Sequence, residues 1–216
     1  MSDTIGSLPR RGFIGAVSVV AAGVSMMGFA EPASAMSTAA DPQLEAWFGK
    51  LKGKHQVVFD APGANDGLPA VWPRVYQITM DATYPGEGVS PMVILRHKGL
   101  GLAFNDAVWA KYHMGDVFDI KVDGAVAAKN PYAVITTLPL PNLGIAKLLS
   151  TGVLIGACDV ALTVYSGAAA AKMKLDAAAV KKEWIAGLLP GVQVVPSGVM
   201  AVARAQEFGA KYIFAG

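Results

Sequence analysis

Two kinds of apolar pattern alternate along the chain. Short continuous apolar runs, typical of buried strands, cover residues 57–59, 92–95, 153–158, 192–195 and 212–214. Between these runs, apolar residues recur at helical spacing. The first stripe follows the N-cap signal Asp41-Pro42 and consists of Leu44, Trp47, Phe48 and Leu51. Further helices are predicted over 69–84, 104–114 before Gly115, 143–151, 160–174, 177–189 after Asp176, and 197–208 before Gly209.

This alternation predicts one α/β domain over residues 36–216. Strands that are apolar on both faces and separated by helices are typical of parallel sheets covered on both sides. We therefore expect a three-layer sandwich, with a five-stranded, mostly parallel sheet and helices on both faces. Residues 116–142 depart from the pattern, because Asp123-Gly124 is a hairpin turn signal and several prolines follow. We interpret this segment as an excursion from the sheet.

The first 35 residues have the parts of an export signal. Arg10-Arg11 precedes Gly-Phe-Ile, residues 12–30 carry no charge, and Ala33-Ser34-Ala35 is a small-residue cleavage pattern. The segment resembles a twin-arginine signal peptide, which predicts cleavage near Ala35 and a soluble periplasmic protein without stable membrane insertion. The alternative interpretation is a retained membrane anchor, but the glycines and serines of residues 12–30 make insertion into a bilayer less favourable.

Composition narrows the possible partners. Eighteen basic and 16 acidic residues give a net charge of +2 without a basic stripe, so we expect no nucleic acid partner. Cys158 is the one cysteine, which excludes an intrachain disulfide framework and a cysteine-rich zinc site. The three histidines are too scattered to predict a metal site.

Ligands of open parallel sheets bind outside the carboxyl ends of the strands. This rule selects Asp60, His97, Cys158 and Ser197, each at or just after the end of a predicted strand. Two more candidates begin the helices that follow, and they are Asn105 and Asp159. We predict that Cys158 and His97 do the chemistry and that the other four contact a ligand.

Cys158 and His97 each allow two interpretations. A thiolate at a helix start is stabilised by the helix amides, although Asp159 opposes this, whereas an inert buried thiol is the ordinary alternative. His97 could act as a proton partner or simply satisfy a backbone carbonyl at a strand end. The sequence does not show whether their strands are neighbours.

Residues 98–104 contain two glycines at the spacing of a dinucleotide-binding loop. The segment follows a strand and precedes a helix, but Phe104 occupies the position of the third glycine. The acidic residues that follow at the usual spacing fall in the excursion. We therefore predict no nicotinamide, flavin or other cofactor, and the chain has no nucleophile elbow or phosphate-binding P-loop.

Four segments of the chain resemble the DsrE/DsrF-like family of sulfur-relay proteins. They are VVFDAP, VILRHKGLGLAF, STGVLIGACDVAL and LLPGVQVVPSGVMAVARAQEFGAKYIF, within residues 54–216. The resemblance implies a parallel α/β sheet, assembly into trimers or hexamers, and a cysteine that accepts sulfane sulfur as a persulfide. Cys158 is similar to that cysteine, and His97 to the histidine that commonly ends the second strand.

The leading functional hypothesis is a periplasmic sulfur-handling protein in which Cys158 carries a persulfide between a sulfur donor and an acceptor protein. The alternative is a non-catalytic small-ligand or partner-binding module, with Trp72, Phe104, Trp109 and Tyr132 around an apolar pocket. A haem or flavin protein is a third, weaker option. We also expect a homo-oligomer, with residues 160–171 and the last strand near its interface.

Overall fold

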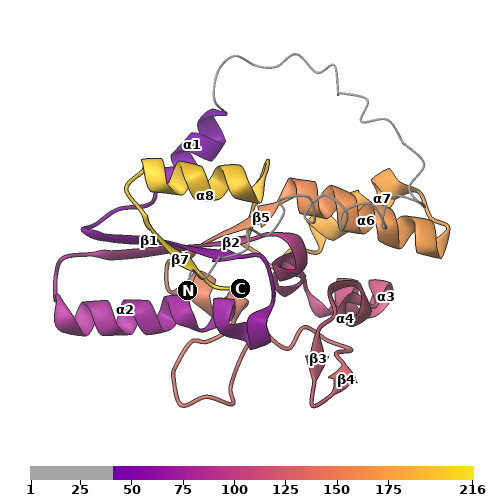
Figure 1. Cartoon of the computed structure of the whole chain (residues 1–216), viewed down its shortest axis with the longest axis horizontal. Helices are drawn as coiled ribbons and strands as arrows, with labels where there is room; N and C mark the ends of the chain where they lie inside the picture. Colours follow the sequence, from indigo (N-terminus) through magenta and orange to yellow (C-terminus); the bar gives the residue numbers. More distant parts are fainter. Residues whose placement is uncertain (1–40) are drawn as a thin grey trace, which may run out of the picture. The chain divides into compact units, whose positions relative to one another are not determined.

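A parallel five-stranded sheet forms the centre of residues 41–216, the part of the chain that the computed structural model describes (Figure 1). The expected export signal, residues 1–35, lies outside the described residues. The sheet strands are β1 (His55–Ala61), β2 (Val89–Leu95), β5 (Leu154–Cys158), β6 (Gln193–Val195) and β7 (Lys211–Phe214). Their order is β6-β5-β2-β1-β7, and every neighbouring pair is parallel. All five predicted strands are confirmed.

Helices cover both faces of the sheet, as the apolar pattern predicted. They are α1 (Pro42–Phe48), α2 (Trp72–Thr83), α3 (Asp106–Tyr112), α4 (Met114–Phe118), α5 (Ile145–Ser150), α6 (Asp159–Met173), α7 (Ala177–Ala186) and α8 (Gly198–Glu207). Two 3₁₀ segments, η1 (Asn65–Ala70) and η2 (His97–Ala103), follow β1 and β2. The fold is thus an α/β three-layer sandwich.

The core is divided by the sheet because neighbouring strand residues point to opposite faces. Val58, Met92 and Ile94 pack with α1 and α8 on one face. On the other face, Phe59 and Val93 belong to a larger apolar cluster that includes residues of α3 to α7. Figure 1 shows α1 and α8 on one side of the sheet, and α2 and α4 on the other.

Three predicted helices differ clearly from the observed ones: α2 begins at Trp72 and not at residue 69, α7 ends at Ala186 and not at residue 189, and the third is divided in two. The helix expected over 104–114 ends at Tyr112, where His113 adopts a left-handed conformation (φ 51°), and α4 begins directly afterwards. Gly115 lies inside α4 and does not terminate a helix. A Cβ atom at Gly115 would lie 2.3 Å from the Ala127 carbonyl oxygen, so the glycine allows the excursion to approach α4.

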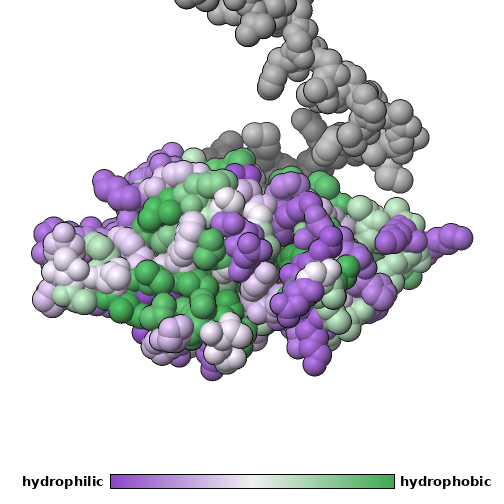
Figure 2. Space-filling view, turned by 60° about the horizontal axis from the view of Figure 1, so that its bottom comes forward, coloured by the Kyte–Doolittle hydropathy of each residue, from purple (hydrophilic) through white to green (hydrophobic). Residues whose placement is uncertain are grey.

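The excursion contains the predicted hairpin, formed by β3 (Lys121–Val122) and β4 (Ala125–Val126) around Asp123-Gly124. The connection that follows exposes Val134, Leu138 and Leu140. Figure 2 brings forward the underside of Figure 1 and shows broad apolar areas between hydrophilic ones. No helix within residues 41–216 is both long and apolar enough to cross a membrane.

Candidate functional site

The order of the strands brings the predicted site residues to one edge of the sheet. Strands β2 and β5 are neighbours, with Leu95 opposite Ala157, so His97 and Cys158 follow adjacent strands. Strand β6 pairs with the other side of β5, which places Ser197 on the same edge. Three segments far apart in the sequence therefore meet at Cys158.

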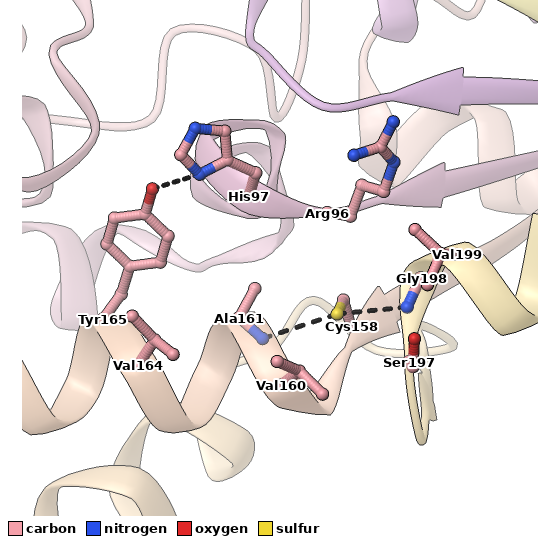
Figure 3. A pocket seen from close by; sticks show the side chains of 10 residues that line it. All are labelled: Arg96, His97, Cys158, Val160, Ala161, Val164, Tyr165, Ser197, Gly198 and Val199. Carbon is pink, nitrogen blue, oxygen red and sulfur yellow. Dashed lines mark hydrogen bonds between the residues drawn. The ribbon is translucent and has the colours of Figure 1, made fainter. Parts of the chain in front are cut away.

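Cys158 lies where two helices begin. It is the N-cap of α6, and its Sγ accepts a hydrogen bond from the Ala161 backbone amide at 3.4 Å. The Gly198 amide, at the start of α8, donates to the same Sγ at 3.1 Å (Figure 3). Backbone N–H groups and helix dipoles favour a negative charge at a helix start. Two backbone N–H groups therefore point at the sulfur of a residue that is only 6% exposed.

A cavity of about 360 Å³ opens beside this thiol. Its lining residues come from the end of β2, the first two turns of α6 and the start of α8, and they are Arg96, His97, Cys158, Val160, Ala161, Val164, Tyr165, Ser197, Gly198 and Val199. Val160, Val164 and Val199 are 55%, 58% and 66% exposed, so apolar surface borders the thiol. This volume is large enough for a small organic molecule.

His97 occupies a different part of the cavity from the thiol. Its Nδ1 forms a hydrogen bond with the hydroxyl of Tyr165, and Figure 3 shows this pair away from Cys158. Burial raises the pKa of Tyr165 above its ordinary value, so the hydroxyl is protonated at neutral pH. Within residues 41–216, the hydrogen bonds to Sγ come from the two amides and not from His97.

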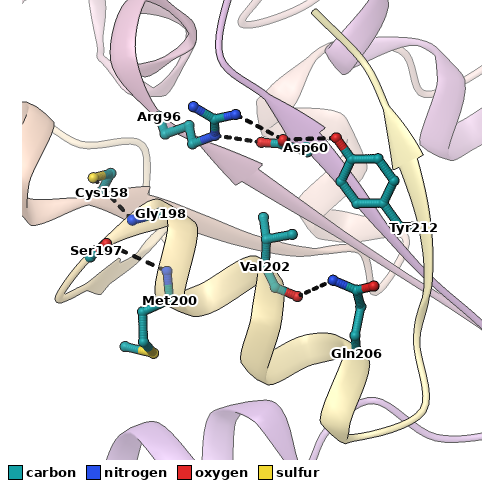
Figure 4. A network of polar contacts seen from close by, with 9 residues as sticks. All are labelled: Asp60, Arg96, Cys158, Ser197, Gly198, Met200, Val202, Gln206 and Tyr212. Carbon is teal, nitrogen blue, oxygen red and sulfur yellow. Dashed lines mark hydrogen bonds and ion pairs between the residues drawn. The ribbon is translucent and has the colours of Figure 1, made fainter.

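The Arg96 side chain is held by Asp60 of β1, which also accepts a hydrogen bond from β7. Its Nε and Nη2 donate to the two carboxylate oxygens of Asp60 at 2.7 and 2.9 Å, and the Tyr212 hydroxyl donates to Asp60 Oδ2 at 3.1 Å (Figure 4). Asp60 is 4% exposed. The contact with Asp60 raises the pKa of Arg96, so a charged pair persists next to the cavity.

The remaining predicted residues have structural partners. Ser197 lines the cavity, and its hydroxyl caps α8 by accepting from the Met200 amide. Asn105 caps α3 through the Val108 amide and does not line the cavity. Asp159 also lies outside the lining and forms an ion pair with Lys181 at 2.8 Å. This pairing offsets the negative charge that was expected to oppose a thiolate.

The aromatic pocket of the alternative hypothesis is not assembled at the thiol. Phe104 and Trp109 are buried in the larger core cluster, with Trp72 and Tyr132 packed against it. The glycine-containing segment 98–104 is likewise filled by the chain itself. A Cβ atom at Gly99 would lie 2.1 Å from the Ala61 carbonyl oxygen, so this glycine serves close packing.

Sequence reasoning missed Arg96, Tyr165 and the Gly198 amide. Arg96 directly follows the second apolar run, and Gly198 follows the Pro-Ser turn after the fourth, so the strand-end rule could have included both. Tyr165 is seven residues after Cys158, a spacing that returns to the same side of a helix. Within residues 41–216, no group of three histidine, cysteine or acidic side chains is arranged to hold a metal ion.

Comparisons with known proteins find similarity to solved structures and no function. No family model matches the sequence, and no curated protein matches it. A solved structure of a protein of unknown function from Methanobacterium thermoautotrophicum is similar, with 20% sequence identity and a TM-score of 0.41. The match covers 74% of this chain and 99% of that one.

Proposed function

We propose that the protein accepts sulfane sulfur on Cys158 and carries it as a persulfide to an acceptor protein. The observation that carries this proposal is the convergence of the Ala161 and Gly198 amides on one Sγ beside an open cavity. A nucleophilic sulfur must be a thiolate, and these donors stabilise that form. The resemblance to sulfur-relay proteins is consistent with this proposal.

The transfer is a displacement at sulfur. The Sγ thiolate attacks the sulfane sulfur of a donor R–S–SH, the donor S–S bond breaks, and R–S⁻ leaves with the electron pair. The product is Cys158–S–SH, and no external oxidant or reductant is needed. Passing the sulfur to an acceptor thiolate reverses the same exchange. Because the chain has one cysteine, no internal disulfide can compete.

The persulfide has donors available in the site. The amides that hold Sγ are fixed by α6 and α8, and the protonated Tyr165 hydroxyl can donate to His97 Nδ1, leaving the proton on Nε2. His97 is exposed and lines the cavity, so its Nε2–H can donate a hydrogen bond to a leaving thiolate. Asp60 acts through Arg96 and does not face the sulfur.

Mass spectrometry of the intact protein tests the proposal. After incubation with an alkyl or aryl persulfide, polysulfide or thiosulfate, we expect a gain of one sulfur atom, removed by a reducing thiol. The matched control is Cys158→Ser, because a serine oxygen can still cap α6 and keep the fold. Absence of any sulfur gain on the wild-type protein with every donor overturns the proposal.

Thiol reactivity separates this proposal from the non-catalytic ligand- or partner-binding module. Iodoacetamide should modify native Cys158 at neutral pH. A thiol that reacts only after unfolding supports the inert interpretation and the binding module.

We further propose that the protein works in the periplasm after twin-arginine export. The proposal rests on Arg10-Arg11 and on the uncharged stretch that follows. Replacing both arginines by lysine should block export, and the mature protein should begin near Met36. Normal periplasmic accumulation of the double variant would point to another route.

A further inference from the structure

The cavity beside Cys158 has apolar side chains along its border, and the guanidinium of Arg96 in its lining is paired with a carboxylate. Val160 and Val164 lie one turn apart on α6, Val199 lies on α8, and each is more than half exposed. Apolar side chains with this much exposure next to a reactive atom favour an apolar ligand. The two amides that donate to Sγ are already engaged by the sulfur.

Charge at the cavity argues against a small inorganic anion as the preferred donor. Arg96 is the one lysine or arginine among the lining residues, and buried Asp60 engages it through two hydrogen bonds. Tyr212 holds Asp60 Oδ2 in place. The arginine stem also packs closely on Gly198, because a Cβ atom there would lie 2.6 Å from Arg96 Cβ. The guanidinium is therefore fixed toward Asp60, with its charge matched.

We infer that the site selects low-molecular-weight sulfur compounds with an uncharged, apolar body, namely organic persulfides or disulfides. The reacting sulfur sits at Cys158 Sγ between the two amides, and the body of the compound lies against Val160, Val164 and Val199. This inference rests on the proposed function only in taking Cys158 as the reacting atom. The cavity volume of about 360 Å³ exceeds what a small inorganic sulfur anion fills and suits an aryl or alkyl group.

Methanethiosulfonate reagents test this selectivity because they share one reaction. The Sγ thiolate attacks the reagent, the S–S bond breaks, a methanesulfinate anion leaves with the electron pair, and Cys158–S–S–R forms. The group R is benzyl, 2-sulfonatoethyl or 2-trimethylammonioethyl. The rate of each reagent with Cys158 is divided by its rate with a small free thiol. This normalisation removes differences in intrinsic reactivity among the three reagents.

We expect the normalised rate of the benzyl reagent to exceed the normalised rates of both charged reagents by roughly tenfold or more, because the ring buries apolar area against the valines. Replacing Val160, Val164 and Val199 together by threonine keeps the side-chain shape and should remove most of this preference. The matched control is Val122→Thr, which changes an exposed valine of the hairpin and should leave it unchanged. Asp60→Asn frees Arg96 and should raise the sulfonatoethyl rate several-fold relative to benzyl.

Three outcomes overturn the inference. A sulfonatoethyl rate above the benzyl rate means that the site takes anionic donors. Equal normalised rates mean that the cavity does not select. A benzyl rate that falls as protein concentration rises means that the valines form an interface between copies of the chain. Benzyl preference without any persulfide on Cys158 would retain this inference while overturning the proposed function, so the two failures are distinguishable.

Discussion

Two turns after parallel strands contain glycine, and the structure uses them differently. After β2, Gly99 and Gly101 are buried, and Cβ atoms there would lie 2.1 Å from the Ala61 carbonyl oxygen and 2.9 Å from the Phe118 ring. After β6, Gly198 directs its amide at Cys158 Sγ. The glycines after β2 allow close packing, whereas the single glycine after β6 contributes to the cavity. The direction of the amide, not the number of glycines, indicates a site.

The largest loss of stability is expected from a substitution in the turn after β2. Gly99→Ala forces a Cβ atom onto a backbone carbonyl oxygen that cannot move away, so we expect a loss of about 3 kcal/mol or more in the free energy of unfolding. Urea unfolding measures this change. The control is Gly167→Ala in α6, where nothing lies within 4 Å and alanine should stabilise by about 0.5–1 kcal/mol. A folded, unaffected Gly99→Ala protein would show that the turn is loosely packed.

The next effect concerns the ion pair of Asp60 with Arg96, the residue that precedes the first turn and packs on Gly198 of the second. Asp60→Asn removes the charge that holds Arg96, whose stem rests on Gly198, and leaves the guanidinium partly buried without a carboxylate. We expect a loss of about 2 kcal/mol in unfolding free energy, less than for a fully buried pair because Arg96 is 27% exposed. Tyr212→Phe should cost less, since it removes one hydrogen bond to Asp60 and leaves the ion pair with Arg96 in place. A larger loss in the tyrosine variant would contradict this order.

A smaller effect on stability, with a clear effect on chemistry, is expected at the second turn. In Gly198→Ala the new Cβ atom meets the Arg96 stem, which must shift, so we expect a cost of about 1–2 kcal/mol. Because α8 moves with Gly198, the amide contact to Sγ weakens, and the rate of Cys158 alkylation at neutral pH should fall about tenfold. Unfolding curves and alkylation kinetics together separate the two effects. An unchanged alkylation rate would show that the Gly198 amide does not govern the thiol.

The smallest effect is expected from the cap of α8. Ser197→Ala removes the hydroxyl that accepts from the Met200 amide at 3.4 Å, a long hydrogen bond, and should cost about 1 kcal/mol or less. Thermal unfolding measures it, and Ser197→Thr should restore stability. Sulfur transfer that disappears in Ser197→Ala with the fold intact would assign the hydroxyl a chemical role beyond capping.

The pattern of apolar residues was sufficient to predict the fold. The five apolar runs are the five sheet strands, and Asp41 and Asp176 accept hydrogen bonds at the helix starts where they were expected. Local signals fix these features, because strand burial and capping depend on neighbouring residues. The end of α3 was missed because a left-handed histidine, His113, leaves no such signal.

The site was predicted by one rule, that ligands bind outside the carboxyl ends of parallel strands, and only in part. The strand-end rule selected Cys158, His97 and Ser197, which line one cavity, because all five strands run in the same direction. The pairing of Arg96 with Asp60 depends on β1 and β2 being neighbours, and the pairing of Asp159 with Lys181 depends on how α6 and α7 pack. Strand order and helix packing are long-range properties that periodicity does not encode.

The expected homo-oligomer, with residues 160–171 and the last strand near its interface, stays a prediction. Tyr212 and Phe214 on β7 are exposed apolar residues of the second region, whereas Val160 and Val164 on α6 border the cavity, so an interface over these valines and a ligand against them would exclude each other. Light scattering at micromolar concentration should show a multiple of the monomer mass, and a monomer would contradict this prediction.

The first strand of the sheet pairs with the last one made. Strand β1 begins at His55, and its outer edge is completed by β7, so that Asp60 lies opposite Phe214. Strand β1 therefore lacks one neighbour until residues 211–214 have been synthesised, and pairing over such a long sequence separation slows folding. Until then the edge of β1 is open to pairing with other chains, so we expect removal of β7 to favour aggregation.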